Sequence, residues 1–350
     1  MMNANLLKRA AALSLAATLV ANAAGAQALT GAGATFPYPL YSKWFDVYKQ
    51  QKNVEINYQS IGSGAGIQQV RAGTVDFGAS DAALSDAQLK DMPRKVVHFP
   101  TVAGAVVLAY NLPGLTAALK LTPELVVGIY MGRIATWNDR RIAVVNPGAK
   151  LPAAPIRAVH RSDGSGTTNI FTNYLAAISG EWKQLVGAGT AVSWPSGVGG
   201  KGNDGVLGVV RQTPGAIGYV ELAYAKQNQL PFALLRNKSG RFIEASLAST
   251  TAAVEGAAAL LARDVRTPIV NSAAPGAYPV SGLTFLLVYR DSKNPARAKA
   301  LADFINWAIH DGQAYAEGLN YARLPAAVVK VNEATLRLLS AGGRKLSVAK

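Results

Sequence analysis

The sequence predicts an α/β protein whose two lobes face each other across a ligand-binding cleft. Strand and helix patterns alternate along the whole 350-residue chain, which is typical of the α/β class. In three places a predicted strand runs into a turn rich in Gly, Ser or Thr that begins a helix, at residues 31–37, 60–66 and 161–168. These turns can surround one ligand only if separate lobes bring them together, and the chain is long enough for two domains.

Residues 1–28 are predicted to be a cleaved secretory signal peptide rather than part of the fold. Lys8 and Arg9 precede a short Ala-rich apolar run over residues 10–24, and small-x-small cleavage patterns follow at residues 24–26 and 26–28. The cleavage boundary is therefore expected at 26–28. No later stretch reaches the run of about 18 apolar residues that a membrane span needs. We expect an exported protein with no membrane span of its own, located in the periplasm of a bacterium that has an outer membrane.

The composition argues against several classes of function. The chain has no cysteine, which excludes disulfides, Cys-based zinc sites, a catalytic Cys and a lipoprotein anchor. Its three histidines are widely spaced, so we expect no metal centre, and no motif indicates a cofactor. Without Lys8 and Arg9 the formal charge is still +13 (15 − 2), but the basic residues are scattered. We therefore expect either attraction of small anions or simply a basic host proteome, rather than nucleic-acid binding.

The turn at residues 161–168 has the features of an anion site. It follows a short apolar strand and precedes a helix marked by apolar residues at helical spacing. A helix start presents free N–H groups and the positive end of the helix dipole, and an Arg adds a planar, charged fork. The groups available here belong to Arg161, Ser165, Gly166 and Thr167, with Asp163 placed to hold the Arg. The alternative is an ordinary capped helix with a surface Arg–Asp pair.

Two earlier turns repeat this strand–turn–helix pattern. One places Thr35 and Phe36 at the start of an aromatic, amphipathic helix that begins near Pro37. The other, residues 60–66, has Ser63 at its tip. Its glycine spacing matches neither the dinucleotide-binding fingerprint nor a P-loop. Both turns are predicted to be further anion-binding helix starts.

Asp81 is predicted to lie in the same site. A buried strand over residues 75–79 ends in Ser80 and Asp81, and ligands of open α/β sheets bind beyond the carboxyl ends of the strands. A carboxylate repels a fully deprotonated oxyanion but accepts a hydrogen bond from a ligand that has a proton. Asp81 would then select protonated oxyanions. The alternative is that Asp81 only caps the turn that follows.

A known family is indicated by six segments in chain order: LTGAGATFPYPLYSKW, IGSGAG, VDFGASDA, RSDGSGTTNIFTNYL, GGKGNDGV and PGAIGYVELAYAKQN. Together they resemble the periplasmic phosphate-binding proteins of high-affinity phosphate ABC transporters, from about residue 29 to 230 and again near 281–289 and 304–308. The resemblance implies a two-lobed periplasmic binding protein of type II, in which each lobe is a mixed sheet flanked by helices and the ligand lies in the interlobe cleft. Lobe one would comprise residues 29–109 and 280–350, and lobe two residues 110–279.

The resemblance also assigns the binding residues. The implied phosphate donors are Thr35, the Phe36 backbone N–H, Ser63, Arg161, Ser165, the Gly166 backbone N–H and Thr167, with Asp81 as the single acceptor and Asp163 as the partner of Arg161. The sequence departs from the family pattern at Gly64-Ala65, which leaves Ser63 intact. Residues 231–280 and 326–350 match weakly, and we expect the tail from Arg323 to Lys350 to be helical and basic.

The implied function is capture of inorganic phosphate by a monomer and delivery to the inner-membrane permease and ATPase of a phosphate ABC transporter, without catalysis. Binding of a related oxyanion, such as arsenate or a phosphate ester, is a near alternative. A secreted serine hydrolase using Ser165 with His160 is another, although that Ser lacks the G-x-S-x-G elbow. His160 and Arg161 would also point to opposite faces of a strand. A basic surface adhesin or nucleic-acid binder is a third.

Overall fold

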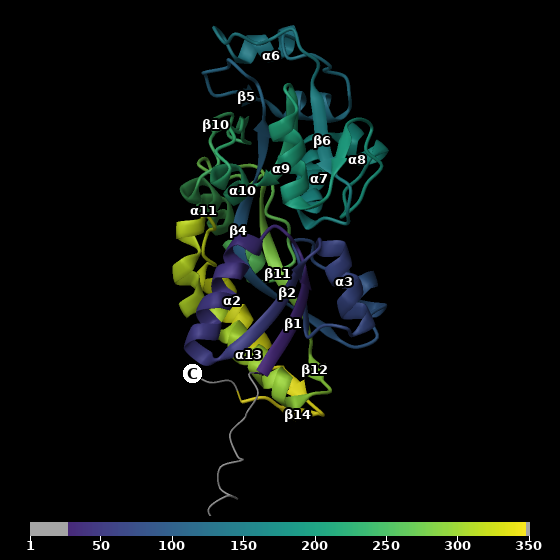
Figure 1. The fold of residues 1–350 in the computed structure, drawn as a ribbon, viewed down its shortest axis with the longest axis vertical. Coiled ribbons are helices and arrows are strands. Elements are labelled where there is room, and N and C mark those ends of the chain that lie inside the picture. The colour runs from purple at the N-terminus through teal and green to yellow at the C-terminus, as the bar shows by residue number, and fades with distance from the viewer. Residues whose placement is uncertain (1–26, 348–350) are drawn as a thin grey trace, which may run out of the picture.

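One eight-stranded sheet runs through the length of the molecule, which the computed structural model describes over residues 27–347 (Figure 1). Its strands are parallel at both ends and antiparallel in the middle, so the sheet is mixed. In order across the sheet they are β2 (Val54–Ser60), β1 (Gln27–Gly33), β3 (Phe77–Ser80), β11 (Ser281–Tyr289), β4 (Val96–Tyr110), β8 (Ala216–Glu221), β6 (Arg157–Arg161) and β7 (Val198–Gly200).

Strand β4 belongs to both halves of this sheet. It pairs with β11 from Val96 to Ala105, and with β8 from Val106 to Tyr110. All of its residues except Val97 are buried, as expected for a strand covered on both faces. The strand begins at Val96 and continues without interruption to Tyr110. The chain thus passes from one half of the molecule to the other along a single strand.

Aromatic side chains hold the half that contains β1, β2 and β3. Helix α2 (Tyr38–Lys52) buries Trp44 and Phe45 on the face predicted from their spacing. The ring of Phe304, from helix α13 (Pro295–Ile309), packs on Phe45 and Phe77 with centroid distances of 5.7 and 6.5 Å. Helix α3 (Ser63–Ala72) packs on β1 and β3. These contacts fix the ends of β1, β2 and β3, from which the turns at residues 31–37 and 60–66 and the Asp81 segment emerge.

The other half is built from β8, β6 and β7 with helices α7 (Gly166–Ile178) and α9 (Gly202–Gln212). Phe171 of α7 stacks on Tyr219 of β8 with ring centroids 4.6 Å apart. Tyr219 also donates or accepts a 2.6 Å hydrogen bond with the Thr168 hydroxyl in the first turn of α7. The start of α7 is therefore anchored to the sheet through Tyr219.

The remaining elements lie around this sheet. Two three-stranded sheets are formed by β10 (Phe242–Ile243), β9 (Leu234–Arg236) and β5 (Lys120–Leu121), and by β12 (Asp291–Ser292), β13 (Ser340–Ala341) and β14 (Arg344–Lys345). The other helices are α4 (Asp86–Lys90), α5 (Pro123–Tyr130), α6 (Arg140–Val145), α8 (Gly180–Leu185), α10 (Leu222–Gln227), α11 (Leu247–Gly256), α12 (Ala258–Leu261) and α14 (Ala326–Leu336), with 3₁₀ turns η1 (Asp311–Tyr315) and η2 (Glu317–Leu319).

The prediction of a helical tail is wrong beyond Leu336. Helix α14 ends there, and the antiparallel pair β13–β14 follows, joined at Gly342 and Gly343. The φ values of these glycines are 57° and 77°, and two successive positive values favour a hairpin turn over a continued helix.

The N-terminal predictions fall largely outside the described residues. Of the predicted signal peptide, residues 1–28, only Gln27 and Ala28 lie within residues 27–347, at the start of β1. Within the described range no helix combines the length and apolar character needed to cross a membrane.

Candidate anion-binding site

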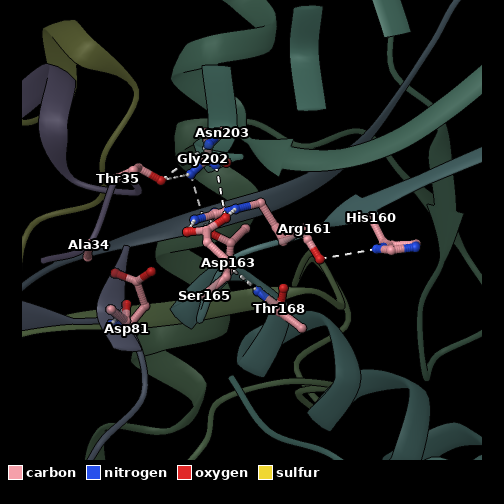
Figure 2. A network of polar contacts seen from close by, with 12 residues as sticks. Ala34, Thr35, Asp81, His160, Arg161, Asp163, Ser165, Thr168, Gly202 and Asn203 are labelled. Carbon is pink, nitrogen blue, oxygen red and sulfur yellow. Dashed lines mark hydrogen bonds and ion pairs between the residues drawn. The ribbon is translucent and has the colours of Figure 1, made fainter. Parts of the chain in front are cut away.

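The three predicted turns and the end of β3 converge at one place between the two halves of the sheet. Figure 2 shows Thr35, Asp81 and the turn from Arg161 to Thr168 at this place. The helices begin close to where the sequence predicts them: α2 at Tyr38, α3 at Ser63 and α7 at Gly166. Ser63 is the first residue of α3, so its side chain lies at the helix start. Because the first N–H groups of a helix lack intrahelical partners, three sets of donors meet here.

Arg161 forms one wall and is held by a two-pronged ion pair. Its Nε donates to Asp163 Oδ1 at 2.7 Å and its Nη2 donates to Asp163 Oδ2 at 2.5 Å. The Arg161 side chain is only 1% exposed, which rules out the alternative of a surface Arg–Asp pair. Burial alone raises the pKa of Asp163, but the hydrogen bonds and charge of Arg161 outweigh it and hold that pKa below its usual value. Asp163 is therefore an ionised anchor for the guanidinium.

The start of α7 continues the same wall. Ser165 is the N-cap residue, and its hydroxyl oxygen accepts a hydrogen bond from the Thr168 N–H at 3.0 Å. Ser165, Gly166 and Thr167 are all buried. The Thr167 hydroxyl oxygen accepts from Arg161 Nη1 at 3.4 Å. Hydroxyl groups and helix-start N–H groups thus surround the edge of the Arg161 guanidinium that does not face Asp163.

The opposite wall comes from the turns after β1 and β2. Thr35 is 4% exposed, and Phe36 and Ser63 are fully buried. Tyrosine hydroxyls hold the backbone of this wall: Tyr224 donates to the Thr35 carbonyl at 2.6 Å and Tyr321 donates to the Phe36 carbonyl at 2.7 Å. Both carbonyl groups therefore have protein donors.

Asp81 lies between the walls with one oxygen free. It is 4% exposed, and its backbone N–H donates to the Ser63 hydroxyl oxygen at 3.2 Å. Within residues 27–347, its Oδ1 has no hydrogen-bond partner although it is buried. Burial raises the pKa of Asp81 to about 7, against opposing effects of the nearby Thr284 hydroxyl and the Arg161 charge. A buried carboxyl oxygen without a protein partner is available to accept from a ligand or a water molecule, or to take up a proton.

The alternative that Asp81 serves only as a turn cap is wrong. The turn after β3 is closed by Ser80, whose hydroxyl oxygen accepts from the Ala82 N–H at 3.0 Å and whose O–H donates to the Ala82 carbonyl at 2.7 Å. The Asp81 carboxylate accepts no such bond from the turn in the described part of the chain. Its side chain is left to face the site.

The two walls touch each other, so the site is closed. The Gly64 N–H donates to the Gly164 carbonyl at 2.8 Å, which joins the α3 turn to the α7 turn. A Cβ built at Gly166 would lie 2.5 Å from both Asp81 Oδ2 and the Ser63 hydroxyl oxygen. All eight predicted binding residues, together with Asp163, are therefore brought into one buried cluster: Thr35, Phe36, Ser63, Asp81, Arg161, Ser165, Gly166 and Thr167.

His160 is not part of this cluster. Its ring points away from Ser165 (Figure 2), its Nδ1 lies 3.1 Å from the Arg161 carbonyl, and it stacks on Trp194 at a centroid distance of 5.0 Å. Across residues 27–347 no hydrogen bond joins His160 to Ser165. The arrangement needed for a Ser–His nucleophile is absent from this site.

Sequence reasoning did not assign two buried polar residues at the site. Asn203, in the first turn of α9, donates through Nδ2 to the hydroxyl oxygens of Thr35 and Thr167. Glu221 ends β8 and lies 3.0 Å from the Tyr321 hydroxyl, and its burial raises its pKa well above the usual value. Both had a signal: Asn203 follows a Gly-rich segment at a helix start, and Glu221 ends a buried strand as Asp81 does.

Comparisons with known proteins identify the family of the chain. The chain matches the PBP superfamily domain over residues 20–311. It is 45% identical over 324 residues to the phosphate-binding protein PstS of Pasteurella multocida, covering 92% of this chain and 94% of that protein. It is 46% identical over 307 residues to the protein of the same name from Xylella fastidiosa (strain Temecula1), covering 87% and 84%.

A solved structure supports the fold. It is that of a high-affinity periplasmic phosphate-binding protein (PfluDING) bound with phosphate at pH 8.5, which matches with a TM-score of 0.69 and 22% identity over 88% of this chain and 93% of that one. The predicted two-lobed α/β fold is thereby confirmed. The chain belongs to the PBP superfamily and, within it, to the family of the phosphate-binding proteins named PstS.

Proposed function

We propose that this protein binds inorganic phosphate in the closed site and delivers it to the inner-membrane permease and ATPase of an ABC transporter for import. The observation that favours phosphate most strongly is the combination of many hydrogen-bond donors with one free acceptor oxygen, that of Asp81. Relatives with 45% and 46% identity are phosphate-binding proteins by name.

The donors suit a dehydrated, doubly charged ligand. Burial of an ion without partners costs far more than a lost hydrogen bond, so a closed site for phosphate needs a donor for nearly every lone pair. The proposed donors are Arg161, the hydroxyls of Thr35, Ser63, Ser165 and Thr167, and the N–H groups of Phe36 and Gly166. Closure of the walls removes water and lowers the local dielectric constant, which strengthens each of these contacts.

Asp81 is proposed to select the ligand. A phosphate that retains a proton can donate it to the free oxygen of Asp81, whereas sulfate has no proton to donate at neutral pH. A site built around a hydrogen bond rejects a ligand that lacks it, because the buried acceptor is then left unpaired. The donors therefore hold any tetrahedral oxyanion, and Asp81 distinguishes between them.

Calorimetric titration of the chain without residues 1–28, using phosphate, sulfate and arsenate in parallel, tests this function. At about pH 9, where Asp81 is ionised because its pKa is about 7, we expect one phosphate per chain and no measurable sulfate binding. If phosphate does not bind while arsenate or a phosphate ester does, the protein is a binder of another oxyanion. Steady turnover of a phosphate ester would instead make it a hydrolase.

The remaining parts of the proposal concern location and architecture. We propose export through the signal peptide and a monomeric, periplasmic protein without enzymatic activity; mass spectrometry of the periplasmic fraction should find a chain that begins after residues 26–28. We also propose lobes of residues 29–109 with 280–350 and of residues 110–279. The change of strand partner between Ala105 and Val106 in β4 supports a hinge near that boundary.

A further inference from the structure

We propose that Asn203 is a positioning residue that turns the hydroxyl protons of Thr35 and Thr167 toward the bound anion from both walls at once. The proposal rests on phosphate binding at this site and adds a residue to it. Asn203 is fully buried and lies in the first turn of α9. It would act through the two threonines, without being a main ligand contact itself.

The amide of Asn203 bridges the two walls. Its Nδ2 donates to the Thr35 hydroxyl oxygen at 2.7 Å and to the Thr167 hydroxyl oxygen at 3.2 Å. Thr35 follows β1 in one half of the sheet, whereas Thr167 lies in α7 in the other half. Figure 2 shows Asn203 reaching Thr35 above the Arg161–Asp163 pair. Each N–H of one amide group thus serves a different wall.

The Thr35 hydroxyl is left with only its proton to offer. A hydroxyl has two acceptor lone pairs and one donor. The Thr35 oxygen accepts from Asn203 Nδ2 and also from the Asn203 backbone N–H at 3.3 Å, which occupies both lone pairs. Within the described chain, the Thr35 O–H donates to no protein group. An anion in the site is therefore the acceptor that this proton lacks.

The Thr167 hydroxyl is constrained in the same way. Its oxygen accepts from Asn203 Nδ2 at 3.2 Å and from Arg161 Nη1 at 3.4 Å. Because both lone pairs of the Thr167 oxygen face N–H donors, the hydroxyl proton must point away from Asn203 and Arg161. Without Asn203, each threonine oxygen would regain a lone pair and its hydroxyl could rotate to a position that repels the anion.

The direction of the amide is itself determined by its neighbours. Asn203 Oδ1 accepts from the backbone N–H of Glu221 at 2.9 Å. A flipped amide would place its NH₂ group against that N–H, donor against donor, and would turn an oxygen toward the Thr35 and Thr167 hydroxyls. The end of β8 thus keeps the donating side of Asn203 facing the site.

A double-mutant cycle tests whether Asn203 acts through the threonines. Phosphate affinity is measured by calorimetry for Asn203→Ala, for the pair Thr35→Val with Thr167→Val, and for all three together. We expect Asn203→Ala alone to weaken phosphate binding about tenfold, the size of one or two hydrogen bonds. In the background without the threonine hydroxyls, the same substitution should cost less than about threefold, because the groups it orients are gone.

A matched control separates positioning from general stability. Asn146 is another buried Asn with three amide hydrogen bonds, to the Lys120 N–H, the Lys120 carbonyl and the Ile142 carbonyl, in the α6–β5 region away from the site. Asn146→Ala should lower the unfolding temperature as Asn203→Ala does, yet leave phosphate affinity unchanged. If Asn203→Ala shows no cooperative unfolding, Asn203→Ser takes its place in the cycle, since it adds no charge beside the anion.

The outcomes are distinguishable. A wild-type chain that fails to bind phosphate would overturn the proposed function rather than the role of Asn203. If the wild type binds and the Asn203 substitution costs the same with or without the threonine hydroxyls, the positioning role is overturned. An Asn203 variant that binds phosphate as the wild type does would overturn it as well.

Discussion

Asp81 and Gly166 come so close together that a Cβ at Gly166 would lie 2.5 Å from Asp81 Oδ2. They belong to opposite walls of the site: Asp81 ends β3, and Gly166 begins α7. The contact shows why the residue at the start of α7 is a glycine. Its N–H and the Asp81 carboxylate can reach one small ligand only if nothing larger than hydrogen stands between them.

Substitution of Gly166 should block closure while leaving the fold intact. In Gly166→Ala the new methyl group would collide with Asp81 and Ser63, so the walls would have to separate and phosphate affinity should fall by at least about 100-fold, as for loss of several contacts. Gly180→Ala, at the start of α8, is the control because its Cβ would meet no atom within 4 Å. Equal phosphate affinity of the two variants in calorimetry would contradict the closed geometry.

Replacement of the Asp81 carboxylate should alter selectivity more than affinity. Asp81→Asn keeps the shape but supplies an NH₂ donor, which can bond to an oxygen of either phosphate or sulfate. We expect phosphate binding to weaken modestly, whereas sulfate binding should become measurable. Calorimetry with both anions checks this, and unchanged rejection of sulfate would remove Asp81 from its proposed role.

The pH dependence of sulfate binding follows from the same carboxyl group. The pKa of Asp81 is raised to about 7 by burial, so protonated Asp81 becomes the main form as the pH falls through that value. A protonated Asp81 can donate to sulfate. Sulfate affinity should therefore rise about tenfold per pH unit between about pH 9 and pH 7 and then level off. Asp81→Asn should abolish this dependence; a wild-type sulfate affinity that is flat with pH would speak against proton-controlled selection.

Removal of the Arg161 guanidinium should be costly because it leaves a buried carboxylate behind. Arg161→Ala is expected to reduce phosphate binding by about 2–5 kcal/mol, the range for a desolvated charge pair. The protein should also lose stability, since the partly buried Asp163 would keep only the Gly202 N–H as a partner in the described part of the chain. Near-wild-type affinity by calorimetry would show that Arg161 does not contact the ligand.

A second Arg in the chain provides a control with the same local geometry. Arg141 holds Asp139, also two residues away, through Nε at 2.9 Å and Nη2 at 2.7 Å, but the Arg141 side chain is 56% exposed. Arg141→Ala should leave phosphate affinity unchanged and alter stability by less than about 1 kcal/mol. The contrast isolates the effect of burial at Arg161.

Local patterns in the sequence predicted most of the framework. The helix starts near Tyr38, Ser63 and Gly166 follow from Gly, Ser and Thr placed directly after apolar strands, since these residues suit turns and N-caps wherever the chain folds. The tail differs from the predicted helix because α14 ends at Leu336 and the positive φ values of Gly342 and Gly343 reverse the chain.

The sequence by itself determined which chemical groups are available: hydroxyls, helix-start N–H groups, one Arg with its Asp, and a carboxylate at a strand end. Only the tertiary structure decided which of them meet. Asn203 donates to Thr35, which lies 168 positions away in the chain. The Asp81 side chain is shielded from solvent because the start of α7 packs against it. The physical reason is the distance along the chain over which each kind of interaction acts. Turn and cap preferences act within a few residues, whereas burial and hydrogen-bond direction depend on how distant strands pair in one sheet.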